Sequence, residues 1–76
     1  MVPHPAMQDW CAVLGKNVHR LRRKKGLTQE ELAFEAEIDL TYMGGIERGK
    51  RNPSLIVIAR IAKALAVPPG RLLREK

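Results

Sequence analysis

The sequence predicts an all-α domain built from five short helices. Apolar residues recur at helical spacing, no segment alternates as a strand would, and capping residues, glycines and prolines divide the chain at short intervals. At 76 residues, the chain suits a single small domain. We expect residues 1–9, which include Pro3 and Pro5, to form a flexible N-terminal arm and residues 10–74 to form the folded domain.

The first helix is predicted over about residues 8–25. Its apolar stripe consists of Trp10, Leu14, Val18 and Leu21. These positions share one side of a helix, so we expect the stripe, Trp10 included, to enter the core. Gly26 ends the helix, because glycine readily takes the left-handed conformation that follows a last helical turn.

The next two helices are short, and each begins at a residue whose side chain can cap it. Thr28 caps the second helix, predicted over about residues 29–36, and Glu31 completes a capping box. Asp39 caps the third helix, which extends to about residue 48 and is ended by Gly49. The inward positions are Leu32, Ala33 and Ala36 in the second helix and Met43 and Ile46 in the third.

A polar loop over residues 50–53 precedes the fourth helix, which Ser54 caps. The residues expected on its buried side are Leu55, Ile58, Ile61, Ala62 and Leu65. Prolines at 68–69 end this helix. Because proline is tolerated in a first helical turn, a fifth short helix is expected through Leu72 and Leu73.

The chain carries a net charge of +6, and its basic residues form two clusters. One cluster comprises Lys16, Arg20, Arg22, Arg23, Lys24 and Lys25, and the other comprises Arg48, Lys50 and Arg51. The acidic residues between them are Glu30, Glu31, Glu35, Glu37 and Asp39. If folding brings both clusters onto one face, they form a footprint for a polyanion such as nucleic acid. A solvated helical face would explain either cluster alone.

Several classes of protein are disfavoured. The longest uncharged apolar run, residues 55–59, is far shorter than the ~20 residues of a membrane-spanning helix. The N-terminus lacks a secretory signal, so we expect a cytoplasmic protein. Cys11, His4 and His19 lack the spacing of zinc ligands, and we expect no metal and no cofactor. No nucleophile–base pair or carboxylate pair is visible, so we expect no enzyme activity.

The second and third helices, joined by a turn of two or three residues, describe a helix-turn-helix. The chain carries GLTQEELA at residues 26–33, IERGKRNPSL at residues 46–55 and AKALAV at residues 62–67. Together these segments resemble the DNA-binding domain of the phage-repressor-like, or Cro/XRE, transcription regulators. The resemblance covers about residues 15–74. It implies a lambda-repressor-like fold and double-stranded DNA as the partner, in a bacterial or phage-type cytoplasm.

In a helix-turn-helix the second helix of the pair, the recognition helix, lies in the major groove with its N-terminal residues toward the bases. The resemblance assigns the outward, base-contacting positions to Leu40, Thr41, Gly44 and Gly45. Neither Leu40 nor Thr41 makes the bidentate contact that identifies guanine or adenine. Two interpretations of the glycines stay open: close approach of the backbone to DNA, or neutral drift on an exposed face.

Phosphate contacts are expected from residues around the recognition helix. The resemblance assigns this role to Gln29 and places Tyr42 near the DNA backbone. From their place just after the recognition helix, we expect the same role for Arg48, Lys50, Arg51 and Asn52. Gln29 stands at the start of the supporting helix, whose N-terminal amides favour an anion. The basic loop can lie along the phosphates at the edge of the groove and position the protein without sequence readout.

Glu47 would be unfavourable beside phosphates unless a cation fixes it elsewhere. The resemblance pairs it with Arg22, which would tie the third helix to the first in a structural ion pair. Two residues depart from the family pattern. Glu37 stands in the turn where glycine is usual and a positive φ is expected, and Gly44 stands where a small hydroxyl residue is usual.

The resemblance implies a sequence-specific transcriptional regulator, most simply a repressor, that binds as a homodimer to half-sites ~34 Å apart. Candidates for the dimer interface are Leu72 and Leu73, with Trp10 as an alternative to its placement in the core. Two other functions stay open. The same fold serves as the antitoxin of a toxin–antitoxin pair, which would bind a toxin protein. A recognition helix poor in side chains also suits a helical adaptor that binds protein.

Overall fold

The computed structural model describes residues 9–75, which fold into four α-helices and one 3₁₀ helix and contain no strand. The helices are α1 (Trp10–Lys25), α2 (Gln29–Ala36), α3 (Leu40–Glu47), α4 (Leu55–Leu65) and the 3₁₀ helix η1 (Pro69–Leu73). The all-α prediction is confirmed, and the fifth predicted helix is the 3₁₀ element. The predicted arm lies outside the described residues except for Asp9, whose carboxylate caps α1 by accepting from the Ala12 backbone N–H.

The predicted starts of α2, α3 and α4 are confirmed, whereas α1 begins at Trp10, about two residues later than predicted. The Thr28 hydroxyl accepts from the Glu31 backbone N–H at 3.0 Å, and the Glu31 carboxylate accepts from the Thr28 backbone N–H at 2.8 Å. Asp39 and Ser54 cap α3 and α4 in the same manner. These bonds satisfy amides that a helix leaves unpaired at its first turn, so residues close in sequence set where each helix begins.

Residues in the left-handed conformation end three of the described helices. They are Gly26 after α1 (φ 78°), Glu37 after α2 (φ 60°) and Ala66 after α4 (φ 59°). The predicted positive φ at Glu37 is confirmed, at a cost of roughly 1–2 kcal/mol for a residue with a side chain. The conformation of Ala66 was not predicted, because alanine gives no sequence signal for it.

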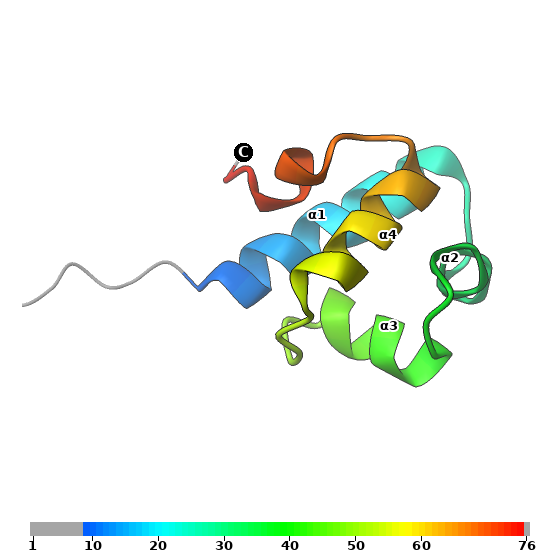
Figure 1. Ribbon diagram of the computed structural model, residues 1–76, viewed down its shortest axis with the longest axis horizontal. Helices are drawn as coiled ribbons and strands as arrows, with labels where there is room; N and C mark the ends of the chain where they lie inside the picture. The colour runs from blue at the N-terminus through cyan, green and yellow to red at the C-terminus, as the bar shows by residue number, and fades with distance from the viewer. Residues whose placement is uncertain (1–8, 76) are drawn as a thin grey trace, which may run out of the picture.

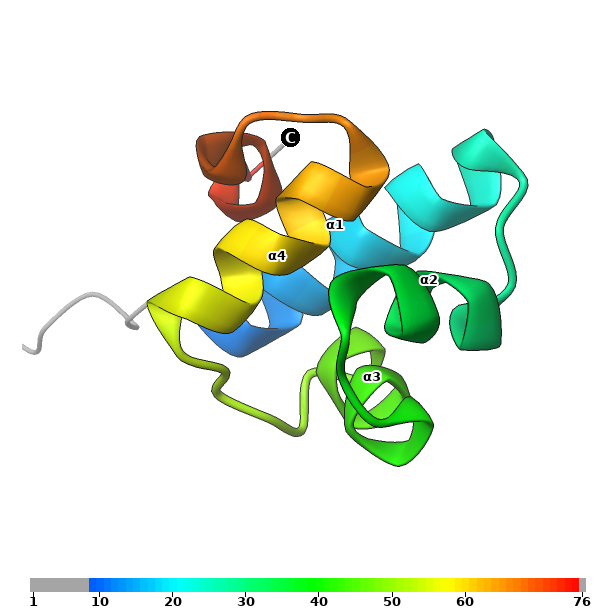
Figure 2. The ribbon, with the colours of Figure 1, turned by 45° about the vertical axis from the view of Figure 1, so that its right-hand side comes forward.

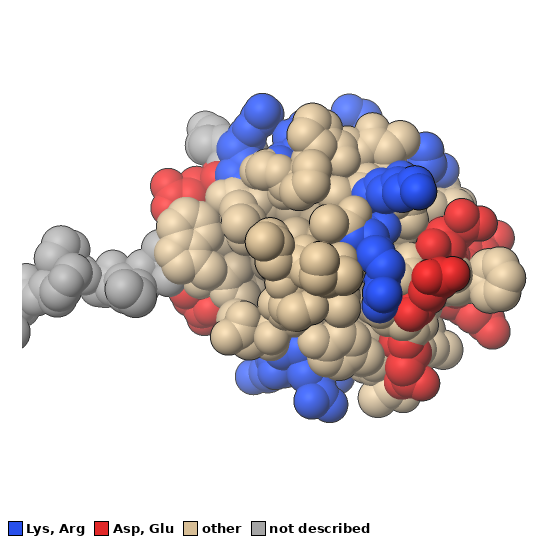
Figure 3. Space-filling view, in the orientation of Figure 1, with Lys and Arg blue, Asp and Glu red and all other residues tan. Residues whose placement is uncertain are grey.

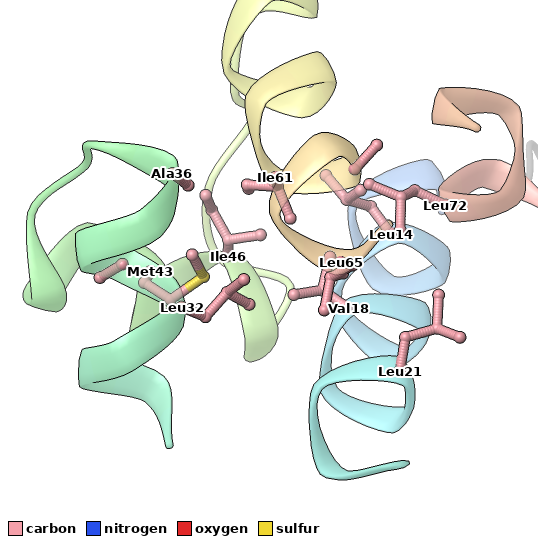
Figure 4. Close-up of a cluster of buried hydrophobic side chains, with 12 residues drawn as sticks. Leu14, Val18, Leu21, Leu32, Ala36, Met43, Ile46, Ile61, Leu65 and Leu72 are labelled. Atoms are coloured by element: carbon pink, nitrogen blue, oxygen red, sulfur yellow. The ribbon is translucent and has the colours of Figure 1, made fainter. Parts of the chain in front are cut away.

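The helices pack around one hydrophobic core. α1 contacts α3, α4 and η1, and α2 packs against both α3 and α4 (Figure 1, Figure 2). Side chains from all five elements converge in the centre (Figure 4). The buried apolar residues are Leu14, Val18, Leu21, Leu32, Ala33, Ala36, Met43, Ile46, Ile61, Ala62, Leu65 and Leu72. This packing holds α3 at the edge of the domain, with its outer side directed away from the other helices (Figure 1).

Two residues predicted to lie in the core do not. Trp10 is 46% exposed and Leu55 is 72% exposed. Each is the first residue of its helix and lies at the edge of the core. Helical spacing identifies which residues lie on the side of a helix that faces the core. Burial also requires that another element packs against the helix at the level of that residue.

Leu72 is fully buried, so the prediction that it forms a dimer interface is wrong. The reason lies in Asn17 of α1, whose buried side-chain amide donates to the carbonyl oxygens of Leu72 at 2.8 Å and Arg74 at 2.7 Å. These bonds hold η1 against α1, and Leu72 thereby closes the core. Leu73 is 39% exposed and stays a candidate for the interface.

Candidate nucleic-acid interface

α2 and α3 form a helix-turn-helix whose turn is residues 37–39 (Figure 2). The Asp39 carboxylate accepts from the backbone N–H groups of Thr41 and Tyr42 at 2.9 and 3.3 Å, which fixes the first turn of α3. Leu40 is 45% exposed and Thr41 is also exposed. The N-terminal turn of α3 therefore presents these two side chains to solvent, whereas Met43 and Ile46 anchor the helix in the core.

The predicted exposure of Gly44 and Gly45 is wrong, because both residues are buried. The side chains of Arg48 and Gln29 lie over Gly44, and the side chain of Arg51 lies over Gly45. The hypothesis of neutral drift on an exposed face therefore loses its premise. The outer surface of α3 at Gly44 and Gly45 is therefore formed by the side chains of Gln29, Arg48 and Arg51, which do not belong to α3 itself.

A basic loop follows α3. Arg48, Lys50, Arg51 and Asn52 are exposed, and the guanidinium carbon of Arg51 lies 5.7 Å from the centroid of the partly buried Tyr42 ring. This distance suits a cation–π contact. Figure 3 shows Lys and Arg gathered on the lower side of the molecule, where Figure 1 draws α3 and this loop. The loop thus adds positive charge next to the exposed turn of α3.

The end of α1, which carries part of the first basic cluster, lies apart from the loop that carries the second (Figure 1, Figure 2). The end of α1 lies at the upper right in both ribbon views, whereas the loop after α3 lies at the lower left (Figure 1, Figure 2). Acidic side chains gather over α2 and the turn between α2 and α3 (Figure 3). The loop cluster adjoins the exposed turn of α3. From the first cluster, Arg22 reaches the end of α3, where its guanidinium is bound to Glu47.

Glu47, the last residue of α3, is held by side chains from two other helices. Arg22 of α1 donates to both carboxylate oxygens, from Nε at 2.7 Å and from Nη2 at 3.1 Å. Gln29 of α2 donates from Nε2 at 3.0 Å, and His19 Nδ1 lies 3.0 Å from the same carboxylate. Arg22 also donates to the carbonyl oxygen of Leu27 at 2.8 Å. The structure thus brings the paired residues Arg22 and Glu47 together and adds two partners.

The Glu47 side chain is only 3% exposed. Burial by itself would raise the pKa of its carboxyl. The hydrogen bonds from Arg22, Gln29 and His19, together with the charge of Arg22, outweigh burial and hold the pKa below its ordinary value of 4.5. The carboxylate is therefore ionised at neutral pH and joins α1, α2 and α3 in one polar network. Sequence reasoning missed Gln29 and His19 as members of this network, because each stands in the sequence like an ordinary surface residue.

Within the described residues, no three His, Cys, Asp or Glu side chains lie together as metal ligands would. The described helices also include none that is long and apolar enough to cross a membrane. The surface around the exposed turn of α3 offers hydrogen-bonding groups and the positive charge of the basic loop. Such chemistry suits phosphates and base edges.

An all-helical domain with an exposed recognition helix beside a basic loop defines the class of helix-turn-helix DNA-binding proteins. The model of the helix-turn-helix family HTH_3 matches residues 18–72, and the chain belongs to this family. HTH_3 is a family of DNA-binding regulators and not of enzymes. The protein is accordingly a DNA-binding helix-turn-helix transcription regulator.

Relatives support this assignment. The chain is 44% identical over 59 residues to the uncharacterised HTH-type transcriptional regulator y4dJ of Sinorhizobium fredii, covering 78% of this chain and 77% of the relative. It is 47% identical over 62 residues to the control protein C.BamHI of Bacillus amyloliquefaciens, covering 80% and 76%. A similar solved structure is the restriction-modification controller protein C.AhdI from Aeromonas hydrophila, with a TM-score of 0.79, 45% identity and coverage of 82% and 94%.

Proposed function

We propose that the protein inserts α3 into the major groove of double-stranded DNA, with Leu40 and Thr41 toward the base edges. The observation that carries the proposal is the exposed first turn of α3 beside the basic loop. Gly44 and Gly45 lie on the same surface beneath arginine side chains. A hydroxyl and a methyl group can contact base edges, although neither forms a bidentate pair. Shape and deformability of the duplex would therefore supply part of the specificity.

Phosphate contacts would come from the residues around α3. The proposed set is Gln29, Tyr42, Arg48, Lys50, Arg51 and Asn52. The amide nitrogen of Gln29 carries two hydrogens, and one of them is directed to Glu47. The other is available for a phosphate oxygen at the start of α2, where the helix terminus also favours an anion.

We infer that the active form is a homodimer, because one recognition helix covers few base pairs and two-fold symmetry matches paired half-sites. Four exposed apolar residues, Trp10, Leu55, Ile56 and Leu73, support this inference. Trp10 and Leu73 border one shallow cavity of about 200 Å³. The face over the N-terminal part of α4 is also broadly free of Lys, Arg, Asp and Glu, whereas blue side chains cross its C-terminal part (Figure 1, Figure 3). Leu73, and not Leu72, would contribute to the interface.

We propose that the protein acts in the cytoplasm as a repressor. It would bind duplex DNA at a promoter and thereby block transcription. Similarity to the immunity repressor protein of Bacillus phage phi105, at 32% identity, supports repression. Similarity to C.BamHI and C.AhdI favours a second candidate role, that of a controller protein for restriction-modification genes. A reporter gene behind the selected DNA site distinguishes activation from repression.

DNA binding is tested by selecting duplexes from a random pool and measuring affinity by fluorescence anisotropy at several salt concentrations. We expect paired half-sites and a steep loss of affinity with salt. Lys50→Ala should weaken binding to all duplexes alike and flatten the salt slope by about 1. Lys16→Ala removes the same charge from α1, outside the proposed interface, and serves as the control. A slope unchanged by Lys50→Ala would remove this residue from the footprint.

The same experiment separates the alternative functions. An adaptor that binds only protein would show no salt-dependent binding to any duplex, and that result would overturn the proposal. An antitoxin would bind DNA and also co-purify with a toxin when expressed from its native locus. Recovery of the regulator alone, together with site-specific DNA binding, supports the simpler function of a transcription regulator.

A further inference from the structure

Arginine side chains cover the two glycines in the middle of α3. A Cβ atom built on Gly44 would lie 3.1 Å from Nη1 of Arg48. A Cβ atom built on Gly45 would lie 2.8 Å from Cγ and 3.1 Å from Nε of Arg51. α3 carries no Lys or Arg of its own, so these two guanidinium groups supply the positive charge on its outer surface.

The two contacts differ in kind. At Gly44 the neighbour is the free end of the Arg48 side chain, which can turn aside. At Gly45 the neighbours are Cγ, Nε and Cδ of Arg51, which belong to the middle of that side chain. The stem of Arg51 therefore lies along the bare backbone of Gly45, and a methyl group there would have to displace it.

Tyr42 supports the other end of the same side chain. It stands three residues before Gly45 and so on the same face of α3. Its ring centroid lies 5.7 Å from the Arg51 guanidinium carbon. Arg51 is thus held at two points, by its stem on Gly45 and by its guanidinium near the Tyr42 ring. A side chain held in one direction loses less conformational freedom when it binds.

We propose that Gly45 is a specificity-determining position that acts through Arg51. The missing side chain at Gly45 lets Arg51 lie against α3 and direct its guanidinium toward paired acceptors on duplex DNA. Such acceptors are the O6 and N7 atoms of guanine or two oxygens of a phosphate, since a guanidinium can bind either pair with two parallel hydrogen bonds. This inference rests on the proposed binding of DNA through α3.

The test compares Gly45→Ala, Arg51→Ala and the double variant on a duplex selected with the parent protein. Gly45→Ala should retain or raise the melting temperature, because alanine favours a helix more than glycine does. Its affinity for the selected duplex should nevertheless fall about tenfold or more. In the Arg51→Ala background, the same substitution should change the affinity within about twofold, because the two residues act as one unit.

Gly70→Ala is the matched control, because a Cβ atom there would have nothing within 4 Å. It should bind DNA as the parent does. The proposal is overturned if Gly45→Ala binds as tightly as the parent, or if it loses the same factor with and without Arg51. Failure of the parent itself to bind any duplex would overturn the proposed function instead, and that result is known before the variants are measured.

Modified duplexes identify the acceptor. If Arg51 binds guanine, 7-deazaguanine at one position should weaken the parent and leave Gly45→Ala unchanged. If Arg51 binds phosphate, a methylphosphonate at one position should give this pattern instead. Either pattern supports the role of Gly45 and assigns the ligand. A parent and a Gly45→Ala variant that respond equally to every modification contradict it.

Discussion

Glu47 shows how one side chain sets the position of the recognition helix. Its carboxylate accepts from Arg22 of α1 and Gln29 of α2 while it stands at the end of α3. A carboxylate shielded in this way is favourable only while its partners remain, since an unpaired buried charge is costly. The network therefore couples the three helices that surround the proposed DNA-binding surface.

Glu47→Gln should destabilise the protein by about 3 kcal/mol, because it leaves the guanidinium of Arg22 without its charged partner. Thermal and urea unfolding measure this loss. Glu35→Gln, at an exposed carboxylate of α2, is the control and should change stability by less than about 0.5 kcal/mol. Equal unfolding midpoints for Glu47→Gln and the parent would refute a structural role for the pair.

The lowered pKa of Glu47 also predicts a dependence of stability on pH. Above its ordinary pKa of 4.5 the carboxyl is ionised in both the folded and the unfolded protein, and its contribution to stability is complete. As the pH falls from this value toward the lower folded pKa, the unfolded chain takes up the proton first and the contribution is lost. Glu47→Gln should lack this part of the acid destabilisation of the parent.

At the scale of elements, the close crossing of α1 and α3 depends on Gly15. A Cβ atom on this residue would lie 2.5 Å from the carbonyl oxygen of Ile46 and 2.7 Å from that of Glu47. Backbone atoms cannot move aside as a side chain can. The absence of a side chain at Gly15 therefore permits α3 to lie directly against α1.

Gly15→Ala should destabilise the protein by about 1–3 kcal/mol through overpacking, despite the better helix propensity of alanine. Gly15→Ala should also weaken DNA binding, because α3 must shift relative to α2 and to the basic loop that follows α3. Unfolding curves and anisotropy on the selected duplex measure the two effects. Gly70→Ala provides the comparison, and a parental melting temperature in Gly15→Ala would contradict the close-contact explanation.

The bounds of the helices were largely predictable, because the signals are local. Thr28, Asp39 and Ser54 bond to amides only two or three residues away, so their effect can be inferred from adjacent letters of the sequence. The roles of Gly15 and Gly45 were not predictable in this way. The role of each glycine depends on atoms of another segment that lie close to it. The spacing of apolar residues within a helix does not indicate such contacts.

At the scale of the whole molecule, the distribution of exposed apolar side chains predicts self-association. Leu55, Ile56, Trp10 and Leu73 are exposed, as are Phe34 on α2 and Leu40 on α3. We expect Ile56→Glu and Leu73→Glu to shift a dimer toward monomers in sedimentation velocity while the circular dichroism spectrum stays that of the parent. Leu72→Glu should instead unfold the protein, because Leu72 lies in the core.

A parent protein that sediments as a monomer at every concentration would contradict the homodimer. A dimer that both glutamate substitutions leave intact would place the interface elsewhere. Loss of dimerisation should also reduce affinity for paired half-sites more than affinity for a single half-site. This comparison links the exposed apolar residues to DNA recognition, because two recognition helices contribute only when the protomers are joined.

The sequence by itself determined the helices, their caps, the helix-turn-helix and the family, because these depend on spacing and on neighbours within one or two turns. Only the tertiary structure decided that Trp10 and Leu55 are exposed, that Leu72 closes the core and that Arg51 covers Gly45. Glu47 likewise gained Gln29 and His19 as partners only through folding. The physical reason is that burial and side-chain contacts depend on which distant segments meet. The spacing of apolar residues indicates which side of a helix faces inward, but not which other segment packs against that side.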